Sequence, residues 1–155
     1  MWGIIAFGMV VVPGIAGILA CIIMTVLTRP VSHLLANGTI NVEVLFLFSL
    51  IVGIPASFIG TIVAVWLAAG FRGHSRAYVV TCGVMGAILG LVGLEIVWTF
   101  AESISLVGGT RTPPPRDSTM MFIFRATAVL TGCISGAIFG FVARELVRVD
   151  ASPSS

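Results

Sequence analysis

The chain has 155 residues, of which 58% are hydrophobic and only 9% are charged, and its formal net charge is +2. A soluble domain has roughly a quarter of its residues charged, so this composition excludes an ordinary soluble fold. The small, scattered positive charge also excludes nucleic acid as a partner. We therefore expect a single membrane domain, residues 1–155, whose surroundings are the lipid bilayer.

Four apolar runs are long enough to cross a membrane, because about 20 helical residues span a hydrocarbon core about 30 Å thick. The runs predict transmembrane helices at residues 2–27, 44–69, 77–100 and 120–147. Loops are expected at 28–43, 71–76 and 101–119, followed by a polar tail at 148–155. The predicted fold class is an all-α, integral membrane bundle of four transmembrane helices.

The first two spans each contain a proline, Pro13 and Pro55. Proline removes a backbone donor and crowds the preceding turn, so we expect a kink in each helix. The connection at 71–76 is too short for anything but an antiparallel hairpin of spans two and three. In the third loop, the run Pro113–Pro115 excludes a helix and favours a short polyproline II segment.

Four spans place both termini on one side of the membrane. That side carries Arg72, Arg76, Arg144 and Arg148, and the other carries Arg29, Arg111, Arg116 and Arg125. Arg125 lies within the fourth span and is discounted, so the positive-inside rule predicts that both termini are cytoplasmic. We expect the membrane to be the inner membrane of a bacterial cell.

The third and fourth spans contain two related segments, TCGVMGAILGLVGLEIVW at 81–98 and TGCISGAIFGFVARELVR at 131–148. The likeness is explained either by duplication or by convergence on a common small-residue pattern. Each segment has glycines on one side of its helix, where they allow another backbone to approach closely. These predicted helix-packing residues are Gly83, Gly86, Gly90, Gly93, Gly132, Gly136 and Gly140.

A second ridge, formed by Thr127, Thr131 and Ser135, runs beside the glycines of the fourth span at four-residue spacing. Two readings are open. In the first, the hydroxyl groups support packing by bonding across helices or back to their own i−4 carbonyl groups. In the second, they line a polar path for a substrate.

Glu95 and Arg125 are charges inside the third and fourth spans. Because these spans are antiparallel, both residues lie near the same membrane surface, and an ion pair is geometrically possible. On a helical wheel, however, Arg125 lies on the glycine face of the fourth span. Glu95 lies nearly opposite the glycine face of the third span. Glu95 is therefore either a structural ion within the bundle or a functional group that faces a cavity or a partner.

The sequence offers little for catalysis or for a cofactor. His33 and His74 fall in loops on opposite sides, and the spans hold no other strong metal ligands, so we predict no metal, cofactor or catalytic residue. An enzyme would have to draw on Glu95, Glu102 and Asp117 near one surface. Glycine-rich spans with a membrane carboxylate resemble the rotary-ATPase proteolipids, but that family carries Glu in the middle of its last span, where this chain has Thr131–Cys133.

These observations favour a structural or accessory subunit of a larger or homo-oligomeric membrane assembly. Its partners would be other membrane proteins or copies of itself, packed through small-residue faces. The alternative is a small transporter or channel with a polar path near Glu95 and Arg125.

Overall fold

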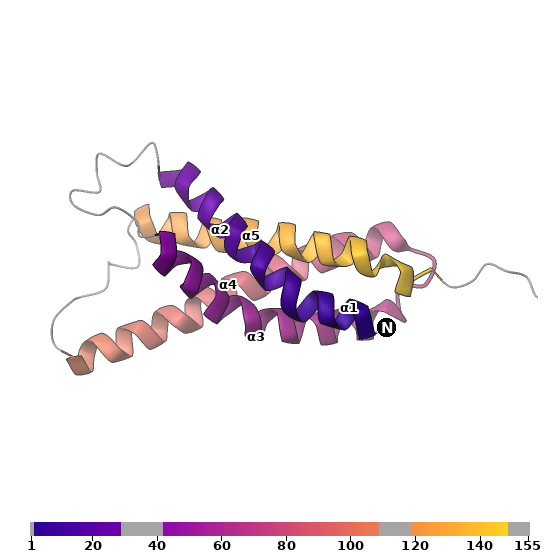
Figure 1. The fold of residues 1–155 in the computed structure, drawn as a ribbon, viewed down its shortest axis with the longest axis horizontal. Helices are drawn as coiled ribbons and strands as arrows, with labels where there is room; N and C mark the ends of the chain where they lie inside the picture. The colour runs from indigo at the N-terminus through magenta and orange to yellow at the C-terminus, as the bar shows by residue number, and fades with distance from the viewer. Residues whose placement is uncertain (1, 29–41, 109–118, 149–155) are drawn as a thin grey trace, which may run out of the picture.

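The computed structural model describes residues 2–28, 42–108 and 119–148, and these ranges form helices and turns without a strand. The first apolar run comprises α1 (Trp2–Ala6), a π-helical turn η1 (Phe7–Val11) and α2 (Val12–Thr28). It is followed by α3 (Val42–Ala68), α4 (Ser75–Gly108), α5 (Thr119–Ala143) and a 3₁₀ turn η3 (Arg144–Leu146). Figure 1 shows these helices lying side by side along one axis.

Four of the helical stretches are long and apolar enough to cross a membrane, which confirms the all-helical, four-span prediction at that level. They cover Gly3–Leu27, Leu50–Ala68, Ser75–Phe100 and Met121–Leu146. Large apolar side chains such as Val10, Trp66 and Phe122 are more than 70% exposed on the outside of the bundle. Such a surface suits lipid and would be costly in water.

The end of the third span differs from the one expected. Helix α4, which carries the third apolar span, continues to Gly108, whereas the sequence predicted a loop from residue 101. Residues 101–107 contain neither glycine nor proline, so the first helix-breaking pair is Gly108–Gly109. The predicted polyproline II segment at Pro113–Pro115, most of the first loop and most of the polar tail lie outside the described residues.

The expected kink at Pro13 takes the form of a π-helical turn directly before it. Pro13 has no N–H group, and its ring would crowd the carbonyl group of Met9 in a regular α-helix. The backbone N–H of Val12 instead bonds the carbonyl oxygen of Phe7, five residues back. Such π-bulges relieve a local break in the hydrogen-bond ladder. At Pro55, in contrast, α3 continues without interruption.

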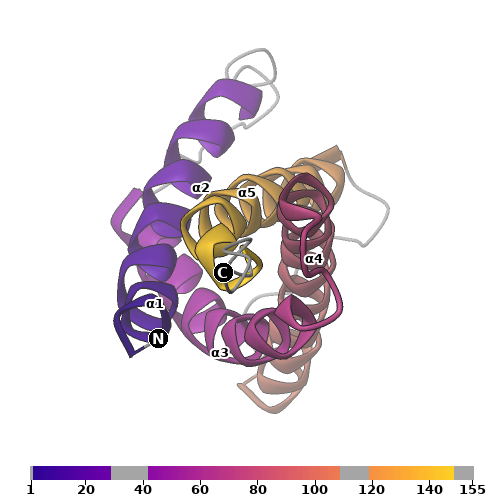
Figure 2. The same ribbon diagram turned by 90° about the vertical axis from the view of Figure 1, so that its right-hand side faces the viewer.

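The four long helices form a ring in which each contacts two others: α2 packs on α3 and α5, and α4 packs on α3 and α5. Figure 2 shows this arrangement along the bundle axis from the side of the termini. The α4–α5 contact is the most extensive of the four. Figures 1 and 2 also show the C-terminal end of α2 leaning away from the other helices.

The tightest core lies at the end of the bundle where the termini are. Tyr78 is fully buried there, and its hydroxyl group donates a hydrogen bond to the carbonyl oxygen of Ala64 on α3 at 3.0 Å. The α3–α4 turn places Gly73 at a φ of +78°, a conformation that favours glycine. The N–H of Gly73 then donates to the carbonyl oxygen of Val147 at 3.1 Å, which ties this turn to the chain after α5.

Between α4 and α5 the two backbones touch at glycines. A Cβ atom added to Gly86 would overlap the carbonyl oxygen of Gly132, and one added to Gly132 would overlap that of Gly86. Gly136 and Gly90 stand in the same way against the carbonyl oxygens of Cys82 and Ala128. Even alanine is too large at these positions unless the helices move apart.

We predict that Gly86→Ala lowers the free energy of unfolding by about 1–3 kcal/mol, because the added methyl group overpacks a backbone contact. Gly14→Ala is the matched control, since a Cβ atom there meets nothing within 4 Å. That change should be neutral or stabilising by about 0.5–1 kcal/mol, because alanine is the better helix former. Unfolding of both variants in lipid nanodiscs provides the measurement, and equal effects of the two changes would contradict the α4–α5 contact.

Candidate functional site

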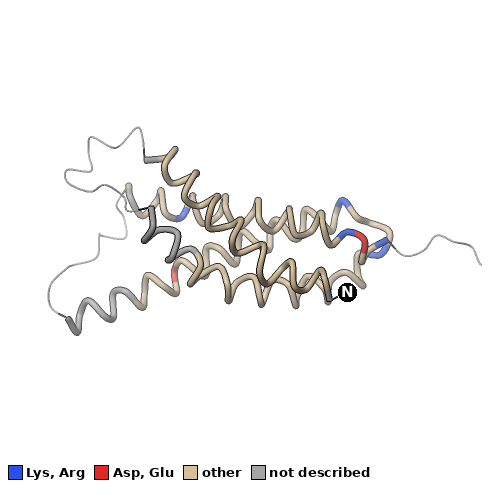
Figure 3. The backbone as a smooth tube through the Cα atoms, in the orientation of Figure 1, with Lys and Arg blue, Asp and Glu red and all other residues tan. Residues whose placement is uncertain are grey.

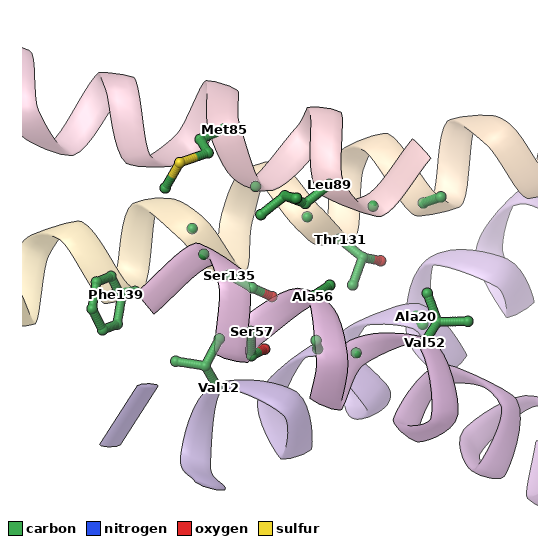
Figure 4. A pocket seen from close by; sticks show the side chains of 18 of the residues that line it. Val12, Ala20, Val52, Ala56, Ser57, Met85, Leu89, Thr131, Ser135 and Phe139 are labelled. Carbon is green, nitrogen blue, oxygen red and sulfur yellow. The ribbon is translucent and has the colours of Figure 1, made fainter. Parts of the chain in front are cut away.

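A cavity of about 160 Å³ lies at the centre of the helix ring, and all four long helices line it. Figure 4 shows labelled side chains from the four helices directed toward this space. Along the bundle it extends from the level of Gly8 and Phe139 to the level of Ala20 and Phe124. It therefore lies beside the tight core at the termini and continues into the middle of the spans.

The cavity exists because small residues face it where a packed core would have larger ones. On the first run, Gly8, Val12, Ala16 and Ala20 line it at four-residue spacing, which keeps them on nearly one side of the helix. Opposite them, the paired glycines of α4 and α5 contribute backbone but no side chains. The contribution of the first apolar run was not predicted from the sequence, although the regular four-residue spacing of its lining residues was a signal for it.

The three hydroxyl residues of the predicted polar path, Thr127, Thr131 and Ser135, all line the cavity and are buried. The Thr127 hydroxyl group donates to the Sδ atom of Met24 at 3.5 Å. The Oγ1 atom of Thr131 and the Oγ atom of Ser135 are buried without a hydrogen-bond partner. A buried polar group without a partner costs free energy, so these two oxygens mark an unusual place in the bundle.

Hydroxyl groups elsewhere in the bundle behave differently. Thr25 donates to the carbonyl oxygen of Cys21 at 2.7 Å, and Thr99 donates to that of Glu95 at 2.8 Å. These are the i−4 back-bonds that satisfy hydroxyl groups on membrane helices. Thr131 and Ser135 do not make them, and both face the cavity. Two further hydroxyl residues, Ser57 and Thr61 on α3, also line the cavity and were missed as site residues by the sequence analysis.

Glu95 and Arg125 form an ion pair between α4 and α5. The Nε and Nη2 atoms of Arg125 each lie 2.8 Å from Oε1 of Glu95. The helical wheel placed Glu95 on the side away from α5, yet these two long, flexible side chains meet. The side chain of Glu95 is 36% exposed and that of Arg125 is 41% exposed. This geometry pairs both charges within the apolar spans, where an unpaired charge would be costly in lipid.

The ion pair lies beside the cavity and not in its wall. Leu94 and Phe124, the residues immediately before Glu95 and Arg125, line the cavity, whereas the two charged residues do not. The ring of Phe124 packs at 6.2 Å from that of Trp98, which is buried. The cavity wall therefore carries no charge among the described residues. Figure 3 shows the described charges placed toward the ends of the bundle.

The predicted packing glycines do not all meet the same neighbour. Gly93 faces α3 instead of α5, because a Cβ atom added to it would overlap Cγ1 of Val52. Gly140 faces Val79 and Cys82 on α4, and Gly83 approaches the carbonyl oxygen of Cys133 at the distance of an ordinary contact. The glycines thus bring α4 close to two helices at once.

The described residues contain no group of three or more His, Cys, Asp or Glu side chains that could hold a metal ion. His74 lies in the α3–α4 turn, where its Nδ1 atom is 3.1 Å from the carbonyl oxygen of Arg72. His33, Asp117 and the side chain of Glu102 lie outside the described part of the chain. Comparison with protein-family models, curated proteins and solved structures finds no match to this chain.

We predict that Glu95→Gln lowers the free energy of unfolding by about 2–3 kcal/mol, because it leaves Arg125 unpaired in the span. The double variant with Arg125→Gln should be more stable than the sum of the two single losses implies, since it removes both charges. Unfolding in nanodiscs, followed by tryptophan fluorescence, measures the cycle.

Glu145→Gln supplies the control for this cycle, because Glu145 pairs with Arg148 at 3.0 Å on the exposed end of the bundle. Its loss should cost less than about 1 kcal/mol. If the losses at Glu95 and Arg125 simply add, the two charges do not depend on each other.

Proposed function

We propose that this chain binds a small neutral molecule inside the membrane, in the cavity at the centre of its helix ring. The observation that carries the proposal is the cavity itself, lined by all four helices in the middle of their spans. Binding sites of membrane transporters are commonly placed at this depth. Binding of this kind is the first step of the small transporter that the sequence offered as an alternative.

The chemistry of the wall favours a neutral occupant over an ion. Its described residues are apolar side chains, glycines and a few hydroxyl groups, with no charge. An ion that enters such a site loses its water and gains neither a charged partner nor a ring of carbonyl ligands. An ion channel along this cavity is therefore disfavoured, and a carrier of uncharged molecules is the better match.

An accessory or structural subunit remains a second proposal, with other membrane proteins or copies of the same chain as partners. The glycines that motivated it lie within the chain, at contacts between its own helices. A partner would instead pack on large outward side chains such as Phe58, Ile62 and Trp66. Native mass spectrometry of the detergent-extracted protein separates the two proposals. If the protein is detected without other subunits and binds the probes described below, it is not an accessory subunit.

The orientation of the chain in the membrane, and the identity of that membrane, are proposed from the distribution of its arginines. The described Arg72, Arg76, Arg144 and Arg148 gather at the end of the bundle that holds the termini (Figure 3). The positive-inside rule then places both termini in the cytoplasm of a bacterial cell, with the bundle in the inner membrane.

A C-terminal fluorescent-protein fusion is expected to fluoresce in a bacterial expression host, because such reporters fold in the cytoplasm. The matching alkaline phosphatase fusion should be inactive. The opposite pair of results would reverse the orientation. The double variant Arg72→Ala and Arg76→Ala, which removes charge from the short hairpin loop, should weaken the bias.

For the cavity, we predict that phenol or toluene raises the unfolding temperature of the protein in nanodiscs in a saturable manner, because a ligand that binds the folded state stabilises it. Both probes are close in size to benzene, which fits an engineered cavity of about 150 Å³ in another protein. Ala56→Leu places a larger side chain in the cavity wall and should weaken the saturable part.

Ala77→Leu is the matched control, because Ala77 is exposed and does not line the cavity. This variant should respond to the probes as the unmodified chain does. Any general effect of the probes on the lipid is common to all three proteins. If Ala56→Leu responds like the unmodified chain with both probes, the cavity does not bind them and the proposed function is wrong.

A further inference from the structure

The two unpartnered hydroxyl groups in the cavity wall indicate what kind of molecule the site would take. Thr131 and Ser135 are only 8% and 5% exposed, and their oxygen atoms have no hydrogen-bond partner. Figure 4 shows both side chains at the cavity, on the same helix. Both residues line the cavity, so a rotation of each side chain about χ1 brings its hydroxyl group to whatever occupies the space.

We propose that the cavity is specific for a small alcohol or phenol, whose apolar body fills the space and whose single hydroxyl group bonds Thr131 and Ser135. This inference rests on the proposed binding function and adds the chemical class of the ligand. The remaining wall is dominated by apolar side chains and glycines, which suits the body of such a molecule.

The spacing of the two residues supports one shared oxygen atom. Side chains four residues apart on a helix have Cβ atoms about 5–6 Å apart. An O–H···O hydrogen bond is about 2.7–2.8 Å long, so one oxygen between the two hydroxyl groups can lie within bonding distance of both. A ligand hydroxyl group can donate to one of them and accept from the other, which gives each of the three groups a hydrogen-bond partner.

The opposite wall carries a further polar group at the same site. Ser57 on α3 also lines the cavity and is labelled near Ser135 in Figure 4. Thr127, in contrast, already donates to the Sδ atom of Met24. Thr61 on α3 is a further hydroxyl residue of the lining, next to Gly8. Thr131 and Ser135 are distinguished from these residues by their buried, unpartnered oxygen atoms.

A hydroxyl-bearing ligand would also be more stable in this cavity than in the surrounding lipid. A pure hydrocarbon such as toluene gains only shape-matched packing from the cavity, because the bilayer around it is about as apolar. A molecule with one hydroxyl group has an unmet hydrogen bond in hydrocarbon, and the cavity supplies it. The same bond relieves the two buried oxygens of the protein.

Phenol and toluene form the matched pair for the test, because they have nearly the same shape and differ by a hydroxyl in place of a methyl group. Dissociation constants for both are measured by stabilisation of the full-length protein in nanodiscs. The ratio of the two constants is then compared between the unmodified chain and a Thr131→Val/Ser135→Ala variant. Comparing ratios removes the different partitioning of the two probes into lipid.

We expect the double variant to lose about tenfold of its preference for phenol over toluene, the value of one to two ordinary hydrogen bonds. Thr25→Val is the control, because Thr25 bonds its own helix and lies outside the cavity wall. Its ratio should equal that of the unmodified chain. The double variant replaces unpartnered buried hydroxyl groups by apolar ones, so its unfolding temperature without probe should not fall, which verifies that it folds.

The outcomes separate the two proposals. Saturable binding of both probes with an unchanged ratio in the double variant overturns the alcohol specificity and leaves the binding function standing. The two hydroxyl groups would then be satisfied by water or by their own helix. Binding of neither probe overturns the binding function and the specificity together. Loss of the preference in the double variant alone supports both.

Discussion

The backbone contact between α4 and α5 is the constraint on which the rest of the bundle depends. Gly86 and Gly132 leave no room for a Cβ atom between the helices, so the separation and the register of α4 and α5 are fixed together. That register brings Glu95 beside Arg125, and the ion pair closes the contact beyond the glycines. It also fixes where the hydroxyl ridge of α5 faces, because Thr131 and Ser135 are the neighbours of Gly132 and Gly136 in the same helix.

The two parts of the bundle interior differ because their side chains differ in size. Near the termini, Tyr78 and Phe139 fill the space between the helices, and the Tyr78 hydroxyl group finds a carbonyl partner. Farther along, small residues of α2 and α3 face the bare backbone of α4 and α5, so the helices remain in contact as a ring while their centre stays open. A rigid, filled end beside an open, neutral middle is an arrangement that suits binding within the membrane.

The polar side chains of the helices fall into three groups by the partner that each one has, and the group without a partner marks the candidate site. Exposed threonines on the helices bond their own i−4 carbonyl groups, as at Thr25 and Thr99. The charges within the spans neutralise each other at Glu95 and Arg125. Thr131 and Ser135 alone among the buried side-chain oxygen and nitrogen atoms of the described residues lack a partner. Because the first two solutions were accessible to a membrane helix, the exception argues for a site that something else completes.

The sequence by itself determined that the chain has four spans apolar enough to cross a membrane, because hydropathy and residue spacing are properties of single segments. It identified Glu95, Arg125 and the ridge from Thr127 to Ser135, but it left their roles open. Only the tertiary structure decided that Glu95 meets Arg125, since a helical wheel ignores the reach of a long side chain. Only the structure showed that α2 and α3, with Ser57 and Thr61, complete a cavity, because a space enclosed by four helices is a property of no single one of them.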